Sequence, residues 1–204
     1  MSLSPNEIVA LLIAVSFAAG LNVYATVATL GLLGHFHAIA LPQSLHLLTS
    51  WPIIAASAAL FGVEFFADKI PAFDLVWNAL HTFIRVPVAA VLAYQAAATL
   101  SPGEQLLAAL AGGMIAFIAH GGKTAVRAAV TPSPEPVTNI SLSLGEDALA
   151  IVLTWMATWK PYIAAAIAAV LVVVTLLLVR AVWRAIQSLF GASRREVHSS
   201  EARR

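Results

Sequence analysis

The chain has 204 residues, of which 60% are hydrophobic and only 10% are charged, and its formal net charge is +1. Soluble domains carry roughly 25% charged residues, and a soluble core of this size could not bury so much apolar surface. The mean hydropathy of +0.88 excludes a soluble enzyme, a disordered chain and a nucleic-acid-binding protein with a basic face. Because cysteine is absent, disulfides, thiolate metal sites and cysteine nucleophiles are excluded as well. The remaining class is an all-α, polytopic transmembrane helical bundle.

The apolar stretches predict the membrane spans. A bilayer core about 30 Å thick needs roughly 20 apolar residues per helix. About six stretches meet or approach this length: residues 7–34, 50–67, 86–101, 104–128, 141–159 and 162–189. The third and fifth are short and adjoin polar segments, so we expect broken or re-entrant helices there. Three spans in each half also allow a 3+3 inverted repeat, supported only by a loose match of small residues.

The positions of lysine and arginine predict the orientation. In a six-span arrangement ten of the 11 basic residues lie on one side, and Lys160 alone lies on the other. Cytoplasmic loops are enriched in lysine and arginine, so we expect both termini to lie in the cytoplasm. The expected location is the inner (plasma) membrane of the cell. Residues 1–190 then form a single transmembrane domain, and residues 191–204 form a basic cytoplasmic tail. The expected partners are the lipid bilayer, a small ion or solute and a second copy in a homo-oligomer, and not a nucleic acid.

The composition of three spans predicts which helices lie inside the bundle. Polar and small residues such as Ser16 and Gly20 interrupt the first span, and the fourth contains four glycines. Small residues allow helix backbones to approach closely in lipid, so both spans should line the interior. The sixth span has no residue more polar than Thr175 between Ile163 and Val179, and it should contact lipid.

Charged and polar side chains between residues 64 and 147 recur at helical spacing, which places them on shared helix faces. With Asn22 of the first span, they form the candidate substrate- or ion-binding residues. These are Asn22; Glu64 and Asp68; Asp74, His81 and Arg85; His120, Lys123 and Arg127; Asn139, Ser143, Glu146 and Asp147.

Each of these stripes also has a structural explanation. Residues 64–69 could form an interfacial helix end, and residues 74–85 an interfacial amphipathic helix with its polar face in water. The basic pair of the third stripe could anchor the topology. Ser143 and Glu146 match a capping box at a helix start. Ionisable groups at membrane depth are costly, however, so the stripes together predict a substrate or ion pathway.

Prolines mark two regions, 64–87 and 120–147, where the helices should be broken. Irregular backbone at membrane depth is tolerated only where protein or a wet cavity covers it. We therefore expect the two regions to face each other across one cavity on the cytoplasmic side. There the acidic groups Glu64, Asp68, Glu146 and Asp147 should meet. Arg85 should pair with at least one of them, because a buried unpaired charge is costly.

Four strings resemble a known family. They are GLNVYATV (20–27), VEFFADKIPAFDLVWNALHTFIR (63–85), HGGKTAVRA (120–128) and SPEPVTNISLSLGEDALA (133–150). The family is a bacterial and plastid group of small multi-pass membrane proteins classed as a domain of unknown function, and the resemblance covers about residues 8–160. It implies a helical membrane fold but no mechanism. Its motifs fall on Asn22, Glu64, Asp68, Lys69, Asp74, His81, Arg85, Lys123, Glu135, Asn139, Glu146 and Asp147.

A transporter or channel for an ion or small solute is the first functional hypothesis. Discontinuous helices present backbone ends and side chains to an ion, which fits charged groups between broken helices. Outside the short outer loops, the cluster from residue 64 to 147 holds six carboxylates against four lysines and arginines. This acidic excess favours a cation or a proton-coupled solute. An anion site formed by Arg85, Lys123 and Arg127 is the alternative.

A membrane-embedded enzyme acting on a lipid and an assembly partner of another membrane complex are the other hypotheses. The chain has no H-E-x-x-H, G-x-S-x-G or P-loop pattern, so the sequence favours a protein that is not an enzyme. No cofactor is expected except a bound cation. Its candidate ligands would suit a hard or borderline divalent ion, and they are Glu64, Asp68, His81, Glu146 and Asp147.

Overall fold

The computed structural model describes residues 4–39, 41–130 and 136–201, and every regular element in these ranges is helical. The predicted all-α class is therefore confirmed. Four of the described helices are long and apolar enough to cross a membrane, or five if the bent pair η1–α3 is one span. In chain order the elements are α1 (Pro5–Leu21), α2 (Val23–His35), η1 (Gln43–Thr49), α3 (Trp51–Ala67), α4 (Pro71–Ala96), α5 (Pro102–Val130), α6 (Pro136–Trp159) and α7 (Pro161–Glu201).

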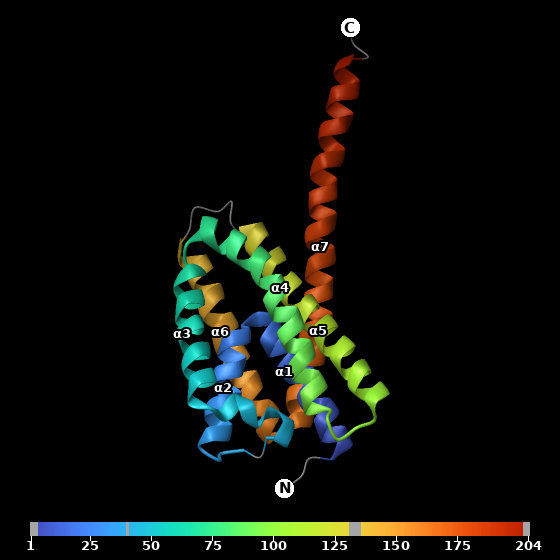
Figure 1. Ribbon diagram of the computed structural model, residues 1–204. Helices are drawn as coiled ribbons and strands as arrows, with labels where there is room; N and C mark the ends of the chain where they lie inside the picture. The colour runs from blue at the N-terminus through green and yellow to red at the C-terminus, as the bar shows by residue number, and fades with distance from the viewer. Residues whose placement is uncertain (1–3, 40, 131–135, 202–204) are drawn as a thin grey trace.

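Helices α1 and α2 form a hairpin in the middle of the bundle, and Asn22 is its tip (Figure 1). The first half of α1 lies beside the start of α5, and Gly20 near its end lies against Ala116 in the middle of α5. Helix α2 then runs alongside α6 in the same direction, since Asn22 before α2 bonds to Asp147, and Thr26, further along α2, lies beside Thr154, further along α6. Because α5 and α6 run in opposite directions, α1 and α2 do so too (Figure 1).

The hairpin changes how many membrane crossings the fold provides. Residues 7–34 were expected to form one span, but α1 and α2 contain only 17 and 13 residues and turn back on each other. Six spans and the 3+3 inverted repeat are therefore not confirmed. Helix α1 begins at the end of the bundle opposite to the one from which α7 extends (Figure 1). Six crossings would have brought both to the same end.

The polar segment before the third predicted span is part of that span and not a separate interfacial helix. Helix α4 runs without a break from Pro71 to Ala96 and contains Pro87 in its interior. Proline removes a backbone donor and usually ends a helix. Transmembrane helices tolerate it where neighbouring groups satisfy the freed backbone. The break lies instead at residues 68–70, before α4. The proline-rich segment 131–135 lies outside the described residues.

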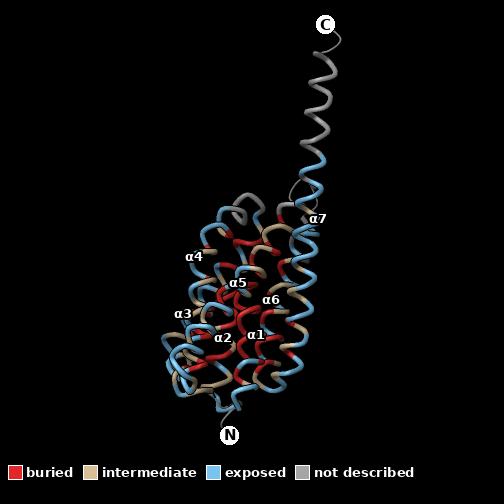
Figure 2. The backbone as a smooth tube through the Cα atoms, turned by 90° about the vertical axis from the view of Figure 1, so that its right-hand side faces the viewer, coloured by how far each residue is buried: buried red, intermediate tan, exposed pale blue. Residues whose placement is uncertain are grey.

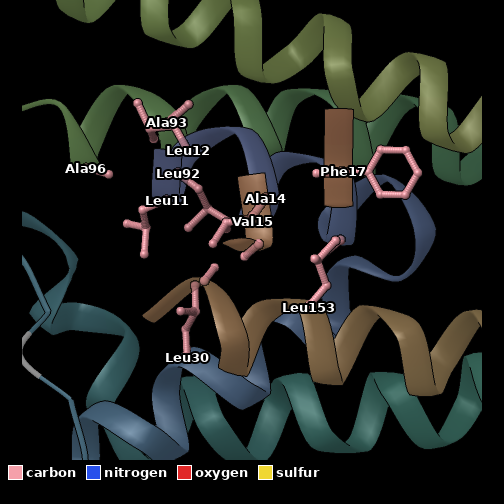
Figure 3. Packing of buried hydrophobic residues seen from close by; sticks show 14 of the residues in the cluster. Leu11, Leu12, Ala14, Val15, Phe17, Leu30, Leu92, Ala93, Ala96 and Leu153 are labelled. Carbon is pink, nitrogen blue, oxygen red and sulfur yellow. The ribbon is translucent and has the colours of Figure 1, made fainter. Parts of the chain in front are cut away.

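The hydrophobic core is built around α1, in which 12 of 17 residues are buried (Figure 2). Figure 3 shows Leu12 and Val15 of this helix among side chains of α4 and α6 such as Leu92 and Leu153. Helix α5 approaches closely as well, since a Cβ atom at Gly112 would lie 2.6 Å from the Cβ of Ala93. The prediction that the first apolar stretch lines the interior is confirmed for α1. The fourth stretch packs closely through one face of α5, but this helix is no more buried than α4 or α6.

Helix α7 is the most exposed of the long helices. In its most apolar 18-residue stretch only 11% of the residues are buried inside the protein, against 33% in the corresponding stretch of each of the other three candidate spans. The predicted lipid contact of the sixth stretch is therefore supported by its position at the edge of the bundle. The helix has 41 residues and would be about 60 Å long at 1.5 Å per residue, so it extends beyond the bundle (Figure 1).

Candidate functional site

Asn22 forms the tip of the hairpin and joins it to α6. Its backbone is extended, with φ −150° and ψ 102°, so the helix is interrupted at this single residue. Its Oδ1 accepts a hydrogen bond of 2.9 Å from the N–H of Ala25, which caps the start of α2. Its Nδ2 donates a hydrogen bond of 2.8 Å to Oδ1 of Asp147. One fully buried side chain thus starts α2 and holds the tip against a carboxylate.

Gly20 allows the tip to reach this position. A Cβ atom there would lie 2.5 Å from the carbonyl oxygen of Ala116 and 2.7 Å from the Cβ of Ala119. Because the first of these neighbours is backbone, it cannot rotate away. Any larger side chain would move the end of α1 away from α5.

Lys123 of α5 lies at the centre of a group of buried ion pairs. Its Nζ is 2.7 Å from Oδ2 of Asp68, 3.4 Å from Oε2 of Glu146 and 3.7 Å from Oε1 of Glu64. The lysine and both α3-side carboxylates have fully buried side chains, and Glu146 is 14% exposed. Helices α3, α5 and α6 are therefore joined by a single cation.

Two arginines complete the ion pairs. Arg85 of α4 donates from Nη2 to Oε1 of Glu64, and both side chains are fully buried. Nη2 of Arg127 in α5 lies 2.7 Å from Oε2 of Glu146 and 3.6 Å from Oδ2 of Asp68. The predicted pairing of Arg85 is confirmed. So is the predicted meeting of the acidic groups of α3 with those of α6.

We call the seven charged residues of this region the charged layer. It comprises Glu64, Asp68, Arg85, Lys123, Arg127, Glu146 and Asp147. All are buried except Glu146, which is partly exposed. The seven residues come from four chain segments, which are α3 with the residue after it, α4, α5 and α6. They are seven of the 13 candidate site residues, and Asn22 at the hairpin tip lies beside them.

Asp68 follows the last residue of α3, and its two cations decide its ionisation. Burial acts to raise the pKa of this carboxyl. The charge and hydrogen bond of Lys123 and the charge of Arg127 outweigh that effect and hold the pKa below its ordinary value. Asp68 is therefore an anion under ordinary conditions, and it fixes both cations of α5.

His120 of α5 continues the network towards α4. Arg85 donates from Nη1 to Nδ1 of His120 at 2.8 Å. Since Nδ1 accepts, Nε2 carries the proton, and it donates to the carbonyl of Asn78 and to the hydroxyl of Thr82, both at 2.9 Å. These bonds hold His120 as a neutral imidazole with a defined tautomer.

His81 lies in the same region but contacts the hairpin. Its Nε2 is 3.1 Å from the hydroxyl of Tyr24, the second residue of α2, and its Nδ1 is 2.8 Å from the carbonyl of Trp77. The tip therefore contacts α4 through Tyr24 and α6 through Asn22.

Asp147 differs from the other acids of the charged layer. Within the described residues no lysine or arginine nitrogen lies within 4.0 Å of its carboxylate. Its Oδ1 accepts only from the neutral amide of Asn22, and its buried Oδ2 has no hydrogen-bond partner. The hydroxyl of Ser143, one turn earlier on α6, is buried and has no partner either. Ser143 lies within α6, so the capping box with Glu146 expected from the sequence is not formed.

Some predicted residues cannot be placed. The side chains of Asp74 and Asn139 and the whole of Glu135 lie outside the part of the chain that the structure describes. Among the described residues no group of three or more histidines and acids is arranged to hold a metal ion. The carboxylates are instead held by lysine, arginine and asparagine.

The sequence-based prediction omitted Tyr24, Asn78 and Thr82 from the site. Thr82 lies one turn and Asn78 two turns before Arg85 on the polar face of α4, so helical spacing places both on the face of the predicted residues. Tyr24 lies two residues after the helix break, and its proximity to α4 depends on the hairpin, which no local pattern indicates.

The fold and the charged layer together define a helical membrane protein with a buried ionic network around a broken helix. A family described as Domain of unknown function (DUF4126) matches residues 9–181, so the chain belongs to this family, as its motifs indicated. No curated protein and no solved structure matches the chain.

Proposed function

We propose that the protein is a small integral-membrane transporter or channel for an ion or small solute, and that the charged layer is its binding site. The observation that carries the proposal is Asp147. Three carboxylates of the layer have a lysine or arginine partner, whereas this fourth one has only Asn22 at the hairpin tip. Ionisable groups at membrane depth are costly and mark substrate or ion pathways. Discontinuous helices are the usual place for such sites.

The charge of the layer supports a positively charged ligand. The four acids are Glu64, Asp68, Glu146 and Asp147, and the three bases are Arg85, Lys123 and Arg127. With all seven ionised, the layer carries a net charge of −1. A single positive charge would neutralise it. The three bases are already paired with carboxylates, so they are less suited to clamp an anion.

We further propose an orientation with five crossings, in which the hairpin enters and leaves on the outer side. Lys69, Lys123 and Arg127 lie towards one end with Arg180 and Arg184 of α7, and Lys160 lies towards the other. The positive-inside rule places the first end in the cytoplasm of a cell with this protein in its inner membrane. The C-terminus would be cytoplasmic and the N-terminus external, with the exposed apolar faces in contact with lipid.

Flux through vesicles tests the transport proposal. We would reconstitute the purified chain in liposomes and measure Na⁺, K⁺, Cl⁻, phosphate and proton fluxes for the parent and for Asp68→Asn. Asp68 anchors two cations, so its neutralisation should abolish the parent's flux. Glu7→Gln is the matched control, because Glu7 caps α1 at the far end and glutamine keeps that cap. Equal flux from a folded Asp68→Asn variant would contradict the proposal.

The other two functions would give different results in that experiment. An enzyme acting on lipid is favoured by one observation, an apolar cleft of about 390 Å³ between α2, α3 and α4 that reaches Tyr24. It would carry no flux but would alter the lipids of the vesicles, which mass spectrometry would detect. An assembly partner would do neither, and affinity purification from its native membrane would yield a stoichiometric complex. A homo-oligomer would be seen as a larger mass in detergent.

A further inference from the structure

We propose that Asp147 is a proton-binding site and that the proton is the cation coupled to transport. This inference rests on the proposed function. It adds the identity of the ion and the atom that holds it, Oδ2 of Asp147.

The first step concerns which acid of the charged layer is the least stabilised as an anion. Glu64 is paired with Arg85, Asp68 with Lys123 and Glu146 with Arg127. Asp147 accepts a single hydrogen bond, and it comes from a neutral amide. A buried carboxylate needs a positive partner or several donors to remain ionised. Asp147 is therefore the acid that takes up a proton first.

The second step concerns the place for the proton. Oδ2 of Asp147 is buried and accepts no hydrogen bond, and the residue as a whole is only 4% exposed. The buried hydroxyl of Ser143 is one helical turn away and is also unpartnered. Serine and threonine hydroxyls inside helices commonly bond the carbonyl four residues earlier, as Thr154 does to Ala150. Ser143 does not, which leaves its oxygen available on the same face of α6.

The third step distinguishes a proton from a metal ion. A metal ion in such a site needs several oxygen ligands. The described residues contain no group of three or more acids and histidines arranged to hold one. A proton needs only one oxygen. It passes from a hydronium ion to Oδ2, so one O–H bond of the hydronium ion breaks, one O–H bond forms on Oδ2, and a water molecule is released. This single charge brings the charged layer from −1 to zero.

The surroundings of Asp147 contain charges of both signs. The groups on the elements around it are Glu64 and Asp68 of α3, Lys69 after α3, Arg85 and His81 of α4, His120, Lys123 and Arg127 of α5, Tyr24 of α2, the neighbouring Glu146, and the exposed Arg180 of α7. Helix α1 has no titratable residue between Glu7 and the tip. Arg85, Lys123 and Arg127 are each paired with another carboxylate, and Lys69 donates to the carbonyl of Phe65. The hydrogen bond from Asn22 is the direct contact of the Asp147 carboxylate, so it changes most when Asp147 is neutralised. Protonation of Asp147 would therefore loosen the hairpin tip from α6.

Infrared difference spectroscopy between acidic and alkaline buffer tests the site directly. The parent protein should show the carbonyl band of a buried, protonated carboxyl group, and Asp147→Asn should lose it. Glu7→Gln, which alters an exposed acid far from the layer, should keep it. Identical spectra for the parent and Asp147→Asn would overturn the proposal. If Asp147→Asn does not fold, Asp147→Glu should move the band, and an unmoved band would likewise overturn the proposal.

Proton flux into vesicles separates this inference from the proposed function. A band that depends on Asp147 in a parent protein without any flux would support the proton site and contradict transport. Solute flux that is the same with and without a pH gradient, and the same in Asp147→Asn, would support transport and overturn the coupled proton. Loss of gradient-driven flux together with loss of the band would support both.

Discussion

Asn22 and Asp147 lie 125 positions apart in the chain and are joined by a hydrogen bond of 2.8 Å at the tip of the α1–α2 hairpin. The same asparagine caps α2 through Ala25. The side chain of Asn22 therefore both caps the helix that begins after the break and donates the hydrogen bond that Asp147 accepts. Any movement of the hairpin tip relative to α6 must break this bond or carry α6 with it.

Replacing Asn22 separates its two roles. Asn22→Ser keeps an oxygen that can cap α2 but loses the amide donor to Asp147, whereas Asn22→Ala loses both. Loss of the cap should cost about 1 kcal/mol, and an unsatisfied buried group about 1–3 kcal/mol more. In denaturation of the detergent-solubilised protein, we expect the parent to be the most stable, Asn22→Ser to be less stable and Asn22→Ala to be the least stable. Equal stability of the two variants would show that the cap has no measurable effect.

The pair formed by Arg85 and Glu64 should show strong coupling. Glu64→Gln leaves the buried guanidinium of Arg85 without its anion. Arg85→Met leaves the buried carboxylate of Glu64 with Lys123 as its remaining cation, at 3.7 Å. Breaking a buried pair on one side costs about 3–5 kcal/mol, whereas replacing both partners can be nearly neutral. A double-mutant cycle measured by unfolding in detergent should therefore give a double variant more stable than either single one. Additive effects would contradict the importance of the pair.

The charged layer could be predicted from spacing because its residues lie in regular helices. Glu64 of α3 and Asp68, the residue that follows this helix, are one turn apart, and Lys123 and Arg127 share a face of α5. A charge on a helix face inside a membrane needs a partner, so acids and bases on different helices were expected to converge. The partners themselves, such as Lys123 with Asp68, depend on helix order and depth, which spacing does not determine.

The hairpin could not be predicted from the sequence, because the turn between α1 and α2 depends on tertiary contacts. Residues 7–34 are mostly apolar and contain no charged residue after Glu7, so their composition indicates one continuous span. The turn depends on a single asparagine in an extended conformation and on close contact at Gly20, and both are tertiary effects. Pro87 misled the prediction in the opposite direction, since a residue that usually ends helices is accommodated inside α4.

Gly20 should be intolerant of any side chain. Gly20→Ala would place a Cβ 2.5 Å from the carbonyl oxygen of Ala116, so the tip or α5 must shift. Overpacking of this kind costs typically about 1–3 kcal/mol. Gly62→Ala is the matched control, because no atom lies within 4 Å of the Cβ added there. Thermal unfolding in detergent should show a lower midpoint for Gly20→Ala and an unchanged or higher one for Gly62→Ala. Equal midpoints would contradict the close packing of the tip.

The direction of the hairpin can be tested by labelling, because the parent chain has no cysteine and is itself the unlabelled control. Single cysteines would be placed at exposed positions: Asn6→Cys in the first turn of α1, Ser101→Cys before α5 and Ser188→Cys near the C-terminal end of α7. A membrane-impermeant maleimide should label Asn6→Cys and Ser101→Cys in right-side-out vesicles and Ser188→Cys only in inside-out vesicles.

This pattern distinguishes the hairpin from a single first crossing. Both arrangements place Ser101 and Ser188 on opposite sides, so these two positions report only the orientation of the bundle. Asn6 lies on the side of Ser101 if α1 and α2 form a re-entrant hairpin, and on the side of Ser188 if residues 7–34 cross once. Labelling of Asn6→Cys together with Ser188→Cys would contradict the hairpin. It would also remove Asn22 from the depth at which it meets Asp147, and with it the argument for a proton site there.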